Sequence, residues 1–211
     1  SSERNAQILI SLMKQHGIKK VVVSPGSTNV CFVGSIQQDP YFEIYSCVDE
    51  RSAAYMAVGL SAESKEPVAL SCTGATASRN YFSALTEAYY RKLPILAITA
   101  SQDENRIGNL VPQVLDRTQQ PKDIVKMSQH LQNVKDKDDE WDVTLKANRA
   151  ILELNHHGLG PVHINLSTTY SKDFSVKALP TARAIHRYDA LSTKLPEIKG
   201  EKIAIFCGTH L

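Results

Sequence analysis

The sequence predicts an α/β fold: a doubly wound domain with a six-stranded parallel sheet and helices on both faces. Short apolar segments alternate along the chain with segments of helical periodicity, an order typical of parallel strand–helix–strand units. The apolar segments lack the polar alternation of half-exposed strands, so both faces of the sheet should be covered. A hydrophobic content of 42% over 211 residues is enough for such a core.

Each predicted strand is a short apolar run that stops at a turn signal. The first run consists of three valines and ends at Ser24-Pro25-Gly26, and the last follows Gly160-Pro161. The predicted strands are 21–23, 44–48, 67–72, 94–100, 124–127 and 162–166.

The segments between these strands have the apolar spacing of helices. The first ends at Gly17, a residue type common just past a helix, and the second opens with the acids Asp49 and Glu50, which suit a helix N-terminus. The charged run 135–142 is most simply a solvated loop or a helix start. The predicted helices are 6–16, 49–63, 80–91 and 141–156.

We expect three parts along the chain. Residues 1–170 form the α/β domain, and 171–200 carry few periodic signals and are interpreted as a linker. The apolar run 202–207 predicts a strand, and a lone strand cannot bury its faces. We therefore interpret 201–211 as the first strand of a truncated central domain.

Composition excludes several classes of function. The net charge of +2 gives no indication of a nucleic-acid-binding face. The longest apolar run, 93–100, is too short to cross a bilayer, and the polar first residues lack a signal-peptide core. The four cysteines have no metal-type spacing, so we expect free thiols in a cytoplasmic protein and no metal ligands in this chain.

Ligands of open parallel sheets bind at the carboxyl ends of the strands. The loops 24–27, 49–52 and 73–76 fall there, as does the polar loop after residue 100, which contains Gln113. The loop 73–76 can receive a flat ring or a phosphate, although an ordinary turn is the simpler interpretation. It matches neither the dinucleotide fingerprint nor the P-loop.

Glu50 is the residue in these loops best suited to proton transfer. It lies between an apolar strand and an apolar helix, where burial favours a carboxyl group that holds its proton. Such a group can exchange a proton with a ring nitrogen. From the pattern alone, an acid that stabilises the helix N-terminus is the simpler interpretation.

Five segments, taken in their order along the chain, indicate a known family: VVVSPGS, CVDERSAAYMAVGLS, CTGATASRNYFSALTEAYY, LPILAITAS and GPVHINL. Together they resemble the N-terminal pyrimidine-binding domain of thiamine diphosphate-dependent enzymes, over about residues 5–166. The resemblance is nearest to the menaquinone-pathway synthases that add a succinyl group to isochorismate. Acetohydroxyacid synthases and oxo-acid decarboxylases are more distant.

This resemblance implies that Glu50 is catalytic, which reverses the simpler interpretation. In the family, the glutamate after the second strand hydrogen-bonds N1′ of the cofactor's aminopyrimidine and helps its imino group take the thiazolium C2 proton. The other cofactor-binding positions that it implies are Ser24, Pro25, Gly26, Thr73, Gly74, Thr76 and Asn80. The substrate-facing positions that it implies are Ser27, Thr28, Asn29 and Gln113.

The resemblance also implies partners. The cofactor is thiamine diphosphate, of which this chain would hold only the pyrimidine half. The family binds the diphosphate and Mg²⁺ in another domain through a GDG motif, which these 211 residues lack. A complete site would need that domain from a neighbouring subunit, so a homodimer or larger assembly is expected. The helix 49–63, with Tyr55 and Met56, is the candidate contact surface.

The implied activity is decarboxylation or carboligation of a small 2-oxo acid, and two departures leave the substrate open. Thr28 and Asn29 stand where the synthase has an arginine. A second arginine of the synthase, after the fourth strand, is absent from residues 101–103. Arginines at these positions suit the carboxylates of a substrate. A relative that acts on another 2-oxo acid is an equal alternative. A separate subunit of a two-chain decarboxylase and a non-catalytic interaction domain of the same fold also stay open.

Overall fold

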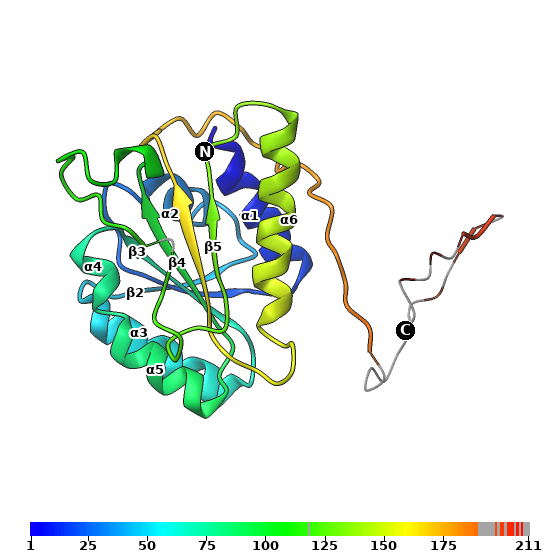
Figure 1. Ribbon diagram of the computed structural model, residues 1–211, viewed down its shortest axis with the longest axis horizontal. Helices are drawn as coiled ribbons and strands as arrows, with labels where there is room; N and C mark the ends of the chain where they lie inside the picture. Colours follow the sequence, from blue (N-terminus) through cyan, green and yellow to red (C-terminus); the bar gives the residue numbers. More distant parts are fainter. Residues whose placement is uncertain are drawn as a thin grey trace.

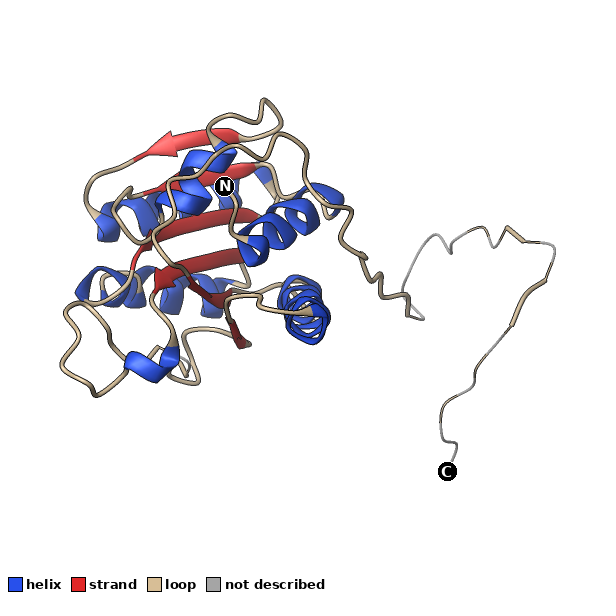
Figure 2. Cartoon of the chain, turned by 90° about the horizontal axis from the view of Figure 1, so that it is seen from above, coloured by secondary structure: helices blue, strands red, loops and turns tan. Residues whose placement is uncertain are grey.

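The computed structural model describes residues 1–117, 119–189, 197, 199–200, 202–204, 206 and 208. A parallel sheet forms its centre, with helices packed on both faces (Figures 1 and 2). The strands are β1 (Lys20–Val23), β2 (Glu43–Ser46), β3 (Val68–Thr73), β4 (Ile95–Ser101), β5 (Ser128–Leu131) and β6 (Val162–Ser167). The helices are α1 (Arg4–Gln15), α2 (Val30–Ile36), α3 (Glu50–Ser64), α4 (Thr76–Arg79), α5 (Phe82–Arg91) and α6 (Lys137–Glu153), with a 3-10 turn η1 (Glu104–Arg106).

The predicted fold class is confirmed. The six strands lie in the order β2-β1-β3-β4-β6-β5, and every neighbouring pair is parallel. The strand order reverses beside β1, where the chain crosses first to β2 and then back to β3. In open sheets a ligand crevice forms at such a switch point, outside the carboxyl ends of the strands.

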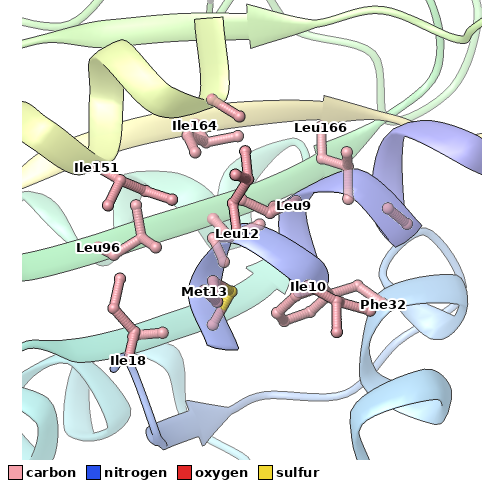
Figure 3. Packing of buried hydrophobic residues seen from close by; sticks show 14 of the residues in the cluster. Leu9, Ile10, Leu12, Met13, Ile18, Phe32, Leu96, Ile151, Ile164 and Leu166 are labelled. Carbon is pink, nitrogen blue, oxygen red and sulfur yellow. The ribbon is translucent and has the colours of Figure 1, made fainter. Parts of the chain in front are cut away.

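One face of the sheet is covered by α1, α2 and α6. Leu9 and Leu12 of α1 point toward β4 and β6, where Leu96, Ile164 and Leu166 lie (Figure 3). This apolar cluster is the larger of two, and its side chains on β4 and β6 are completely buried. The second cluster lies on the opposite face, where α3 and α5 cover the strands.

The segment after β6 lies along α1 and α6 (Figure 1). Gln15 of α1 donates to the Ala182 carbonyl (2.9 Å), and Asn148 of α6 donates to the Arg183 carbonyl (2.9 Å). The described part of the predicted linker 171–200 contains no helix or strand. The domain limits stay a prediction. So does the strand 202–207, because Ile205, Cys207 and the last three residues lie outside the described part of the chain.

Two local predictions were wrong. The fifth strand is Ser128–Leu131, four residues later than predicted, because Ile124 lies in a turn and packs with Val125 into the α3–α5 cluster. The helix α2 was missed because its sequence, VCFVGSI, is only seven residues long and has no clear helical spacing of apolar residues. Within the described residues, no helix is long and apolar enough to cross a membrane.

Candidate functional site

The loops after β1, β2 and β3 meet at one edge of the sheet, as expected for parallel strands. Ser24 Oγ donates to the Cys47 carbonyl (2.8 Å), which joins the first loop to the second. The amide of Gly74 donates to Thr28 Oγ1 (3.3 Å), which joins the third loop to the first. Long-range hydrogen bonds between loops therefore hold this edge together.

The first loop is closed by Asn29, whose side chain is completely buried. Its amide donates to the Ser24 carbonyl (3.1 Å), and its Oδ1 accepts from the Gly26 amide (2.8 Å). Gly26 touches the third loop so closely that an added Cβ would lie 2.2 Å from Thr73 Cγ2. A residue with a side chain at position 26 would therefore force the Thr73 side chain to move.

Of the six predicted residues in this first loop, Ser24 is buried and Gly26 is partly exposed, and the other four fall into two groups. Pro25 and Ser27 are exposed at the edge of the sheet. Thr28 and Asn29 are buried beneath it and hold loops in place through the bonds just described. Their predicted role in facing the substrate stays a prediction.

Glu50 is the first residue of α3 and is partly exposed. Asp49 caps this helix by accepting from the Ser52 amide (2.7 Å), so Glu50 stands in the first turn, where the helix dipole stabilises negative charge. Its Oε2 accepts from Asn80 Nδ2 (3.4 Å). The fold thus brings together two predicted residues that are 30 positions apart, and it leaves the carboxylate room for further partners.

The third loop carries backbone strain. Ala75 has φ +58° and ψ −139°, a conformation that costs a residue with a side chain about 1–3 kcal/mol. Thr76, the first residue of α4, is exposed, and Thr73 is partly exposed. Strain of this kind gathers at ligand-binding sites, which agrees with the position of this loop at the switch point.

Gln113 lies in the loop between β4 and β5, exposed and with a φ of +62°. It makes no contact with Glu50 or Asn80 among the described hydrogen bonds. Its predicted place near the substrate stays a prediction.

The sequence reasoning missed Arg117, in the same loop. Its side chain is only 1% exposed, and its Nη2 donates to Asn165 Oδ1 on β6 (3.1 Å). An arginine in a polar loop gives no signal of burial, because only the contact with β6 places it inside.

His163 of β6 is buried and hydrogen-bonded within the domain. Its Nε2 lies 2.8 Å from Thr99 Oγ1, and its Nδ1 lies 2.7 Å from Ser128 Oγ. Burial, with Arg117 nearby, lowers the pKa of His163 to about 3. The ring is therefore neutral at physiological pH and does not act there as a proton donor in its charged form.

The chain is similar to known proteins over most of its length. Residues 4–127 match the family model described as "Thiamine pyrophosphate enzyme, N-terminal TPP binding domain". The chain is 39% identical over 193 residues to 2-succinyl-5-enolpyruvyl-6-hydroxy-3-cyclohexene-1-carboxylate synthase of Bacteroides thetaiotaomicron. The aligned region covers 91% of this chain and 35% of the relative. The synthase of the same name from Phocaeicola vulgatus matches with the same identity and coverage.

Among solved structures, benzoylformate decarboxylase from Polynucleobacter necessarius has the same fold. The TM-score is 0.65 at 22% identity, over 87% of this chain and 33% of that one. The chain thus spans about a third of the length of the relatives that it matches.

The fold is that of an α/β domain in which the loops after β1, β2 and β3 meet at the carboxyl edge of the sheet, where ligands of open parallel sheets bind. With the family model matched over more than half of its length, the chain belongs to the N-terminal cofactor-binding domains of thiamine pyrophosphate enzymes. The chemistry of this edge is compatible with the cofactor, because Glu50 offers a partly exposed carboxylate that can accept a hydrogen bond from a ring nitrogen.

Proposed function

We propose that this chain is the pyrimidine-binding domain of an enzyme that decarboxylates a 2-oxo acid, joins it to an acceptor, or does both. The observation that carries the proposal is the placement of Glu50 at the start of α3, partly exposed and hydrogen-bonded to Asn80. A carboxylate there can hold a proton on a ring nitrogen of the bound cofactor.

The residues of this chain bind the aminopyrimidine ring of the cofactor and orient it. Glu50 holds the proton at N1′, and the Asn80 amide fixes the direction of its carboxylate. Ser24, Pro25, Gly26, Thr73, Gly74 and Thr76 form the walls of the ring site. When bound, thiamine diphosphate would supply a thiazolium ring that takes up the electron pair left by decarboxylation.

The rest of the site belongs to other parts of the enzyme. The diphosphate and Mg²⁺ are held by a separate domain of a neighbouring subunit, which makes the working unit a homodimer or larger, in the cytoplasm. The exposure of Tyr55 (43%) and Met56 (39%) on the outer side of α3 supports a subunit contact there.

The reaction named for the bacterial synthases is one candidate for this enzyme. In this chain Thr28 and Asn29 are buried and bonded within the domain, so neither supplies the charge that a carboxylate of the acceptor needs. We therefore assign the substrate only as a 2-oxo acid.

The test is Glu50→Gln in the full-length enzyme that contains this chain. Glutamine keeps the size of the side chain but cannot exchange the proton, so we expect turnover to fall by about 10²- to 10⁴-fold. The matched control is Glu63→Gln, an exposed glutamate near the end of the same helix, which should leave turnover unchanged. Undiminished turnover in Glu50→Gln would remove the assigned role.

A further inference from the structure

Tyr170 has a strained backbone conformation just beyond the end of β6. Its φ of +62° lies in the left-handed region, which residues with large side chains rarely adopt. The amide of Tyr170 donates to Thr168 Oγ1 (3.0 Å), so a hydrogen bond within the turn holds this conformation. A strained residue persists only where its surroundings impose the conformation, and such residues are concentrated at functional sites.

The carboxylate of Glu3 fixes the turn around Tyr170. Its Oε1 accepts from the amides of Thr169 (3.0 Å) and Ser171 (3.1 Å), on either side of the tyrosine. The same oxygen accepts from the hydroxyl groups of Thr168 (2.9 Å) and Thr169 (3.1 Å). Hydrogen bonds to a charged acceptor are strong, and Glu3 is buried. Glu3 is therefore a positioning residue for Tyr170.

The turn also joins the end of β6 to the end of β4. The amide of Thr168 donates to the Ser101 carbonyl (2.7 Å), and Gln102 Nε2 donates to Tyr170 Oη (2.6 Å). Gln102 and Tyr170 are both partly exposed. A ligand can therefore contact this Tyr170–Gln102 pair without any opening of the fold.

The Tyr170–Gln102 pair lies close to the third loop of the proposed site. Ala100 is in register with Thr73, and Ser101 is in register with Ser167. Because neighbouring strands lie about 4.8 Å apart, the end of β6 is about 10 Å from the end of β3. A Cβ added to Gly74 would lie 2.9 Å from the Ala100 carbonyl oxygen, so the third loop touches the end of β4. A substrate bound beside the third loop is thus within reach of the pair.

The pair offers both a donor and an acceptor to a ligand. Tyr170 Oη accepts from Gln102, and its own proton has no acceptor among the described residues. The side-chain oxygen of Gln102 has no hydrogen-bond partner in the described part of the chain. A hydroxyl group both donates and accepts, so one hydroxyl of a ligand satisfies both atoms.

We propose that Tyr170 and Gln102 recognise a hydroxyl group on the side chain of the 2-oxo acid substrate. Tyr170 donates to the oxygen of this hydroxyl, and Gln102 accepts a hydrogen bond from it. An acid with a methyl group in place of the hydroxyl is disfavoured, because it leaves both protein groups unpaired. This inference rests on the proposed function and specifies the substrate class.

The test compares 4-hydroxy-2-oxobutyrate with 2-oxovalerate, in which a methyl group replaces the hydroxyl. The full-length enzyme is loaded with thiamine diphosphate and Mg²⁺, and kcat/KM is measured for wild type and Tyr170→Phe. The wild type should prefer the hydroxylated acid by at least about 10-fold. Tyr170→Phe should reduce this preference by about 10-fold, the value of one hydrogen bond, and leave kcat/KM for 2-oxovalerate unchanged.

Tyr41→Phe is the matched control. The Tyr41 hydroxyl donates to the Lys14 carbonyl (3.2 Å), and Tyr41 precedes β2, at the opposite edge of the sheet. This variant should keep the preference of the wild type.

Equal losses for both acids in Tyr170→Phe would indicate a merely structural tyrosine and overturn the proposal. An unchanged preference in that variant overturns it too, as does a wild type without the preference, including one that turns over neither acid. Should Tyr170→Phe not fold, Gln102→Met removes the amide at similar size. A reduced preference in Gln102→Met supports the proposal, and the preference of the wild type overturns it.

Cofactor binding by the wild type is measured separately. If the wild type does not bind thiamine diphosphate, the proposed function fails. Normal cofactor binding with an unaltered preference in Tyr170→Phe removes only the role of the Tyr170–Gln102 pair.

Discussion

The two faces of the sheet are built from alternate residues of the same strands, yet their chemistry differs. On β6, Ile164 and Leu166 point into the apolar cluster under α1 and α6. On the same strand, His163 and Asn165 point to the other face, where both are buried in hydrogen bonds. Successive side chains of a strand point to opposite faces, so one strand serves two environments.

The second face is itself divided. Along β1 and β3 it is apolar and covered by α3 and α5. Along β4 and β6 it carries Thr99, His163 and Asn165, and Arg117 from the loop after β4 covers part of it. The polar half adjoins the proposed site. One face of the sheet therefore supplies stability, while half of the other holds a polar network beside the proposed site.

The largest expected loss of stability follows a substitution on the apolar face of the sheet. Ile164→Ala in the full-length protein should lower the free energy of unfolding by about 3 kcal/mol, because it leaves a cavity among packed side chains. Urea unfolding followed by circular dichroism measures the loss. Leu110→Ala, at a side chain that is 99% exposed, should change it by less than about 0.5 kcal/mol. Similar losses in both variants would contradict the assignment of stability to this face.

A smaller loss of stability is expected for a substitution in the polar network on the other face. Asn165→Ala removes the partner of Arg117 and of His130, whose Nδ1 lies 2.9 Å from Asn165 Nδ2. It should cost about 2 kcal/mol, since it leaves buried polar groups unpaired. In an Arg117→Gln background the loss should be smaller, because the charge is gone. An equal loss in both backgrounds would show that the two residues are not coupled.

Per pH unit, the smallest expected change in the free energy of unfolding comes from lowering the pH. The folded state holds the pKa of His163 at about 3, below the ordinary value of 6.5. Between these values the unfolded state binds the extra proton, so stability is full above pH 6.5 and falls as the pH drops toward 3. The contribution of His163 approaches about 1.4 kcal/mol per pH unit. Burial lowers the pKa of His130 as well, which adds in the same direction.

His163→Gln should flatten this dependence, since glutamine does not titrate. The measurement is urea unfolding of both proteins between pH 7 and pH 4.5. Identical slopes for wild type and variant would assign the pH dependence to other groups.

Much of the site was predictable because its residues sit just after strands. The end of an apolar run marks Ser24, Glu50 and Thr73 as neighbours on one edge, and the fold brings these loops together. The buried state of Thr28 and Asn29 was not predictable. Short polar residues are common in exposed turns, and only the packing of three loops encloses these two.

The sequence by itself determined the class of fold, most of the strands and the place of Glu50, because periodicity and turn residues act over a few neighbouring positions. The tertiary structure alone decided the order of the strands and the start of β5. It alone also decided the burial of Arg117. The Arg117–Asn165 bond joins residues 48 positions apart, and the Glu50–Asn80 bond joins residues 30 apart. No local pattern encodes such contacts, since they form only when distant segments pack on the same sheet.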